Sequence, residues 1–413
     1  MGGITAYGFL ALAARALGPE RYAPLSSLWA LTFNVAPGLF LPLEQQVGRH
    51  VAHGLAGGQG SRSTLHRAVV LGLGMLALLL AVLLLARPWL DVQIFDDYRI
   101  LSFALGLSLC GYASEHLLKG IFLGTGRFAA YGVLVGSEGV ARLAICAVLF
   151  VAGNDDPGAY GLAFAAGPVF ASLLLAGKAR VEHGASTASW TEMSAALFYL
   201  LAGSLCAQTL VNGGPLAVKL LATPAQSEQA GRFLVALVVA RVPLFMFQAV
   251  QASLLSRLAT LSGAGLRDDF VTVVTGLLRF VFALGMIAIA AAYFIGPTLV
   301  RAFFGAEFAL SGAGLAVLAA AVVAFMGAIV LAQVLVALSG YVRLMLGWLL
   351  GVVVFVGACL LPGSVVPRVE RAFLAGCLAA CFGLLGFAWG ALSRRDPSPG
   401  EAAAVALPEA LDR

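Results

Sequence analysis

Charged side chains are scarce in this sequence. Asp, Glu, Lys and Arg make up 11% of its 413 residues, and hydrophobic residues make up 61%. A soluble globular domain carries about 25% charged residues, which cover its surface. The shortage of charge excludes an ordinary soluble protein and predicts an integral membrane protein.

Period-two alternation of polar and apolar residues is also missing. Apolar runs long enough to cross a hydrocarbon core of about 30 Å as helices recur instead along the whole chain. The missing alternation excludes the class of outer-membrane barrels. The predicted fold class is all-α, a polytopic membrane protein.

The residue patterns typical of metal sites, nucleic-acid binding and catalysis are missing from the sequence. The six cysteines lie inside apolar runs with no metal-ligand pattern near them, so we interpret them as packing residues. The basic residues do not cluster as they do for a nucleic-acid partner. We find no nucleophile, metal or phosphate-loop constellation, and we expect no enzyme activity and no cofactor.

Hydropathy and breakers predict twelve transmembrane helices. They cover residues 2–17, 24–43, 67–86, 100–121, 128–151, 160–177, 193–221, 230–255, 271–295, 309–337, 343–361 and 371–392. The first of them lacks a basic segment and a cleavage site, so we interpret it as a span and not as a signal peptide. The Pro- and Ala-rich tail from Ser393 is predicted to be disordered.

Alternate loops differ in charge. One set contains most loop arginines, among them Arg49, Arg62, Arg127 and Arg180, and the other contains most loop acids. The positive-inside rule then places both termini in the cytoplasm and the protein in the cytoplasmic (inner) membrane. No loop is long enough to fold as a domain, so the function must lie among the helices.

The two halves of the chain resemble each other. LFLPLEQQVGRHVAHGLAG is similar to LFMFQAVQASLLSRLATLSG, RPWLDVQIF to GPTLVRAFF, and TGRFAAYG to LSGYVRLMLG, in the same order and at an offset near 208. Six repeated spans give halves of equal orientation, related by an axis along the membrane normal. We therefore predict a six-helix lobe over 1–178, a cytoplasmic linker over 179–192, a second lobe over 193–392 and a tail over 393–413.

Four segments carry a family resemblance: LGPERYAPLSSLWAL, LEQQVGRHVAHGLAGG, LGTGRFAAYG and AGRFLVALVVARVPLFMFQAVQASLLSRLATL. With them the chain resembles the oligosaccharide flippases, or polysaccharide biosynthesis exporters, of the multidrug/oligosaccharidyl-lipid/polysaccharide exporter superfamily. The resemblance implies two lobes around a central cavity and movement of a polyprenyl-linked sugar by alternating access. Many relatives carry an Asp shortly after Asn212, where this chain has glycines and a proline.

Charges within the first-half spans form two acid-then-base pairs at i, i+4. Glu115 and Lys119 lie on one helix and Glu138 and Arg142 on the next, at overlapping depth, so a four-charge cluster is possible. These charges must face the bundle interior or a wet cavity, because lipid exposure costs ~2.5 kcal/mol or more per ion. They are either structural ion pairs, or Arg142 and Lys119 meet substrate phosphate while Glu115, Glu138 or His116 carries a coupling proton.

Arg241 in the second half has no acid one turn away and is followed by Pro243. It is the best candidate for contacting a diphosphate, and the alternative is a cross-helix partner such as Glu138. Gln45, Gln248 and Gln251 suit sugar hydroxyls but equally hydrogen bonds between helices. Lys219 and Arg15 lie near span ends, where we expect them to snorkel.

Three functions compete. The first is a flippase for polyprenyl-diphosphate-linked oligosaccharide in surface polysaccharide biosynthesis, which we expect to act as a monomer among membrane lipids and beside glycosyltransferases or a polymerase. The second is a cation-coupled small-molecule or drug antiporter of the same superfamily. The third, a membrane glycosyltransferase or polymerase, lacks a loop that could cradle a sugar donor.

Overall fold

The computed structural model describes residues 2–56, 62–179, 190–223, 226, 228–244, 247, 258, 261, 266–308 and 310–393. Within these ranges the chain forms α-helices and short 3-10 segments and no strand. Eight of the described helices are long and apolar enough to cross a membrane. The prediction of an all-α polytopic membrane protein is therefore confirmed.

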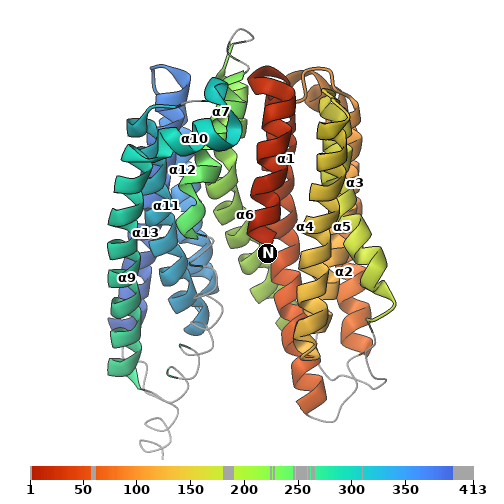
Figure 1. Ribbon diagram of the computed structural model, residues 1–413. Coiled ribbons are helices and arrows are strands. Elements are labelled where there is room, and N and C mark those ends of the chain that lie inside the picture. Colours follow the sequence, from red (N-terminus) through yellow and green to blue (C-terminus); the bar gives the residue numbers. More distant parts are fainter. Residues whose placement is uncertain are drawn as a thin grey trace, which may run out of the picture.

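The first half of the chain forms five helices. They are α1 (Gly2–Ala56), α2 (Arg62–Gln93), α3 (Ile100–Gly124), α4 (Phe128–Val151) and α5 (Pro157–Ala176). The expected helices 2–17 and 24–43 are both parts of α1, which is broken at Gly18, where φ is 67° and ψ is 170°. Glycine adopts this left-handed φ without a clash, and Pro19 suits the first turn of a helix. The chain thus rises to the top of the view in Figure 1 and descends again.

The second half forms seven described α-helices and the 3-10 helix. They are α6 (Trp190–Leu221), α7 (Glu228–Ala240), α9 (Arg267–Phe294), α10 (Gly296–Phe304), η2 (Ala306–Phe308), α11 (Gly312–Ala337), α12 (Tyr341–Cys359) and α13 (Val365–Ser393). The predicted helices agree with these apart from their ends, and most of the predicted span beyond Leu244 lies outside the described residues. The short helix α10 was not expected. It begins at a Gly-Pro pair whose counterpart, Arg87-Pro88, lies inside α2.

Corresponding helices pack alike in the two halves. The contact of α2 with α3 corresponds to that of α9 with α11, the contact of α3 with α5 to that of α11 with α13, and the contact of α4 with α5 to that of α12 with α13. Figure 1 shows the result as two bundles, α1–α5 and α6–α13. The predicted linker lies mostly outside the described residues, as does the predicted disordered tail beyond Ser393, and α6 begins three residues earlier than the predicted second lobe.

The two bundles are joined at one end, the upper end in Figure 1, which we call the closed end. There Lys219 of α6 forms an ion pair with Asp96, with 2.6 Å between Nζ and Oδ1, and the rings of Tyr22 and Phe308 meet edge to face. Arg15 donates to the carbonyl oxygens of Phe303 and Ala302. The expectation that Lys219 and Arg15 snorkel is therefore wrong, since both have partners in the opposite half of the chain.

Candidate functional site

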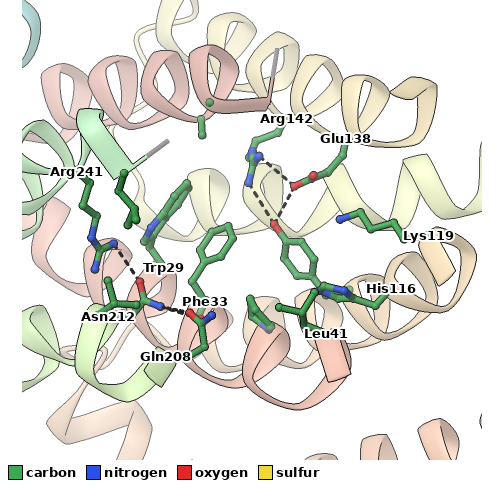
Figure 2. A pocket seen from close by; sticks show the side chains of 16 residues that line it. Trp29, Phe33, Leu41, His116, Lys119, Glu138, Arg142, Gln208, Asn212 and Arg241 are labelled. Atoms are coloured by element: carbon green, nitrogen blue, oxygen red, sulfur yellow. Dashed lines mark hydrogen bonds and ion pairs between the residues drawn. The ribbon is translucent and has the colours of Figure 1, made fainter. Parts of the chain in front are cut away.

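A cavity of about 370 Å³ lies between the two bundles. Such a volume is within the usual range for small-molecule sites. Its lining comes from both halves of the chain (Figure 2), with α1, α3 and α4 on one side and, on the other, α6 and the residues that follow α7. The lining residues are Gly3, Ala6, Trp29, Phe33, Pro37, Leu41, Tyr112, His116, Lys119, Glu138, Arg142, Gln208, Val211, Asn212, Arg241 and Leu244.

The first-half side of the cavity contains a hydrogen-bonded ion pair. Glu138 and Arg142 are one turn apart on α4, with 3.0 Å between Oε1 and Nη2. Tyr112 of α3 donates to the same carboxylate oxygen at 2.8 Å and accepts from Arg142 Nη1 at 3.4 Å. The predicted i, i+4 pair is thus present (Figure 2). Tyr112, which the sequence did not single out, bridges the two helices.

Aromatic rings surround the Arg142 guanidinium. Its Cζ lies 5.4 Å from the ring centroid of Phe164, 5.6 Å from that of Trp29 and 6.0 Å from that of Phe9. The negative faces of such rings attract a cation within about 6 Å. Arg142 is therefore held by a carboxylate, a phenol and three rings, and its exposed fraction is only 2%.

Two more acid–base pairs involve α3. Lys119 Nζ lies 2.7 Å from Glu115 Oε1, and His116 Nδ1 lies 2.6 Å from Oε2 of Glu44 on α1. Lys119 and His116 line the cavity, whereas the fully buried Glu115 is not among its lining residues. The expected four charges therefore form two separate i, i+4 pairs, and His116 has a carboxylate partner that lies 72 positions away in the sequence.

Arg241 on the opposite side of the cavity has a different environment. Helix α7 ends at Ala240, so Arg241 lies at the break before Pro243, in agreement with the effect of proline on preceding residues. Its Nη1 donates to Asn212 Oδ1 at 3.0 Å, and its buried Nε and Nη2 have no hydrogen-bond partner among the described residues. No described carboxylate pairs with it, and the alternative partner Glu138 is bound to Arg142.

Asn212 connects Arg241 to the other half of the chain. Its Nδ2 donates to the backbone oxygen of Phe33 at 2.9 Å and to Gln208 Oε1 at 2.9 Å. The carbonyl of Phe33 would accept from residue 37 in a regular helix, but that residue is a proline and has no N–H. Pro37 therefore leaves the Phe33 carbonyl oxygen of α1 without its helical hydrogen bond, and Asn212 of α6 donates to it instead. The same Asn212 side chain accepts from Arg241 and orients it.

Of the three predicted glutamines, only Gln45 lies within the described residues. Gln45 is exposed on α1 and is not among the lining residues, and Gln248 and Gln251 lie outside the described residues. The amide that does line the cavity beside Asn212 is Gln208. Neither Asn212 nor Tyr112 was predicted as a site residue, because their partners lie far away in the sequence.

Sequence comparisons find similar proteins without a described function. No protein-family model matches the chain. An uncharacterized protein of Mycobacterium bovis is 28% identical over 384 residues, which cover 90% of this chain and 86% of that protein. Another uncharacterized protein, from Mycobacterium tuberculosis, is 28% identical over 382 residues, covering 90% of this chain and 85% of its own length.

Structural comparison is more informative. An inward-facing multidrug resistance MATE family transporter of the MOP superfamily superimposes with a TM-score of 0.74 at 13% identity, covering 96% of each chain. An outward-facing structure of a MATE transporter of the same superfamily gives 0.64 at 14% identity over 95% of this chain and 93% of its own. A mutant of a Vibrio cholerae MATE transporter gives 0.63 at 15% identity, with 94% and 93% covered. The chain thus has the fold of the MATE transporters of the MOP superfamily.

Proposed function

We propose that this protein is a transporter that moves a polyprenyl-diphosphate-linked oligosaccharide across the cytoplasmic membrane by alternating access. Its fold is that of transporters described in both inward-facing and outward-facing conformations. Its cavity lies between the two halves of the chain, which is where transporters built from repeats bind their substrates.

The choice of substrate rests on Arg241, a buried arginine on the wall of this cavity. Two of its guanidinium nitrogens, Nε and Nη2, have no hydrogen-bond partner among the residues that the structure describes. Burying a cation without an anion costs several kcal/mol, so such a site favours an anionic ligand. A diphosphate presents oxygens that the planar guanidinium fork engages in pairs. Trp29 and Phe33, which lie between the two polar sides of the cavity in Figure 2, offer ring faces to the first sugar.

The alternative, a cation-coupled drug antiporter, needs a carboxylate that is free to bind a cation. Among the described lining residues Glu138 is the only acid, and Arg142 and Tyr112 already occupy it. A cationic drug would therefore have to displace a buried arginine. This comparison of charges favours the anionic substrate.

The closed end faces outward in this proposal. It contains the acidic loop residues Asp96, Asp155 and Asp156, whereas most basic loops lie at the other end of the helices. By the positive-inside rule the end opposite the closed end then faces the cytoplasm, together with both termini. In this orientation the cavity is open to the cytoplasm, where lipid-linked sugars are made. Cysteine labelling of Asp155→Cys from outside intact cells is the measurement that checks this orientation.

The test compares three variants in cells in which this chain is the sole exporter. Arg241→Ala should abolish export, with lipid-linked oligosaccharide accumulating on the cytoplasmic leaflet, and Arg241→Lys should restore it only in part because lysine offers a single point charge. Arg232→Ala is the matched control, since Arg232 lies on α7, nine residues before Arg241, and pairs with Glu228. Normal export by Arg241→Ala at normal abundance would disprove the proposed role.

A further inference from the structure

His116 and Glu44 form a buried pair on the cavity wall that the proposed function leaves without a role. His116 lines the cavity, and its Nδ1 lies 2.6 Å from Glu44 Oε2. Because a carboxylate only accepts hydrogen bonds, Nδ1 carries the hydrogen of a neutral imidazole and Nε2 is the nitrogen that can take a further proton. No hydrogen bond joins Nε2 to the part of the chain that the structure describes. The pair is therefore a place where one proton can be added beside the cavity.

The ionisable groups around His116 come from three helices. They are Glu44 of α1, Tyr112, Glu115 and Lys119 of α3, and Tyr131, Glu138 and Arg142 of α4. Two further helices pack on α3, namely α2 and α5. The charged residues of α2 lie near its two ends, and the one ionisable residue of α5, Tyr160, bonds to the Asn154 oxygen at the closed end.

Positive and negative charges around the cavity balance when His116 is neutral. The two i, i+4 pairs of α3 and α4 each cancel. The remaining charges are the carboxylate of Glu44 and the guanidinium of Arg241, which has no counterion among the described residues. A diphosphate diester bound to Arg241 brings two negative charges against one positive charge. Glu44 and one phosphate charge are then uncompensated inside the membrane, where uncompensated charge is costly.

We propose that the cavity takes up one proton, at Nε2 of His116, when it binds the diphosphate-linked sugar. This inference rests on the proposed function, because it takes the diphosphate as the ligand of Arg241. The proton turns His116 into a cation that neutralises Glu44. Figure 2 shows His116 and Arg241 on opposite sides of the cavity, and charges at buried sites act on each other with little screening by salt.

Glu138, the acid among the described lining residues, is a poorer acceptor for this proton. Its Oε1 accepts from Tyr112 and pairs with Arg142. A proton on Glu138 would leave the buried Arg142 without a counterion. A proton on His116 strengthens the existing hydrogen bond with Glu44, because both partners then carry charge.

The experiment is isothermal titration calorimetry of the purified protein in detergent with farnesyl-diphospho-N-acetylglucosamine, whose phosphates stay charged near neutral pH. Titrations in phosphate and in Tris buffer, which release different heats on losing a proton, give the number of protons taken up per bound probe. We expect about one proton for the wild type. Because the complex then holds one proton more than the free protein, its affinity should fall by up to about tenfold per pH unit between about pH 6 and about pH 8.

Two substitutions should lower the proton uptake and change the affinity in opposite directions. His116→Gln keeps a donor for Glu44 but cannot gain a charge, so binding at about pH 6 should weaken about tenfold. Glu44→Gln removes the negative charge that the proton compensates, so binding at about pH 8 should tighten about tenfold. His50→Gln is the matched control and should change neither quantity, because His50 bonds to the backbone oxygen of Gln46 and is not among the lining residues.

The other outcomes overturn the inference in distinguishable ways. Binding of the probe by the wild type without proton uptake would overturn the inference and leave the proposed function standing. Unchanged proton uptake in His116→Gln would place the proton on another group. Weaker binding by Glu44→Gln would mean that the pair only holds α1 against α3. Failure of the wild type to bind the probe at every pH would overturn the proposed function together with this inference.

Discussion

The buried basic side chains are paired differently on the two sides of the cavity. On the first-half side each basic side chain has a carboxylate partner: Arg142 has Glu138, Lys119 has Glu115, and His116 has Glu44. On the second-half side Arg241 has only the neutral amide of Asn212 among the described residues. A paired charge stabilises the fold only while its partner stays, whereas an unpaired charge lowers stability until a ligand arrives.

Glu138→Ala is the substitution that we expect to have the largest effect on stability. It leaves Arg142 buried without a carboxylate, and we expect a loss of about 3–5 kcal/mol in the free energy of unfolding, visible as low abundance. The double variant Glu138→Ala with Arg142→Leu should lose less, since no charge is stranded. Normal abundance of the single variant would contradict a buried pair.

Replacing either arginine by leucine should change stability in opposite directions. Arg142→Leu strands Glu138 and should lower the free energy of unfolding by a few kcal/mol, whereas Arg241→Leu removes a charge without a described counterion and should raise it by about 1 kcal/mol or more. Thermal unfolding in detergent, followed by near-UV circular dichroism, measures both. Equal destabilisation by the two variants would mean that Arg241 also has a structural partner.

The hydrogen bond between Asn212 and Phe33 on the second-half side can be tested through Pro37, with a smaller expected effect. Pro37→Ala returns an N–H to the helix, which should occupy the Phe33 oxygen and weaken its bond with Asn212. We expect export to fall several-fold through misorientation of Arg241, while Pro42→Ala on the same helix has little effect. Asn212→Leu should reproduce the loss, and wild-type export by both Pro37→Ala and Asn212→Leu would exclude the link.

The smallest effect is expected for Tyr112→Phe. The substitution removes the hydroxyl that donates to Glu138 and accepts from Arg142, but it keeps the ring and the ion pair. The expected loss is about 0.5–1.5 kcal/mol in the free energy of unfolding, the usual net contribution of one hydrogen bond. A loss as large as that of Glu138→Ala would mean that the phenol and not the ion pair holds α3 and α4 together.

The sequence by itself determined the helical membrane fold. In lipid each backbone must satisfy its own hydrogen bonds, so an apolar run of sufficient length forms a helix whatever surrounds it. The pairs Glu115–Lys119 and Glu138–Arg142 were predictable for the same reason, because residues at i and i+4 are neighbours on any α-helix. The absence of an acid one turn away from Arg241 was predictable too.

Only the tertiary structure decided which distant residues meet. The partners Glu44 and His116, Asp96 and Lys219, and Phe33 and Asn212 are far apart in the sequence and lie on different elements. Helix packing likewise turns Arg241 into the cavity and Arg279 toward the outside, although each is an arginine in an apolar segment of the sequence. The sequence of a helix specifies the angle of each side chain around the helix axis. Which face of the helix is turned toward the core follows from contacts among all helices.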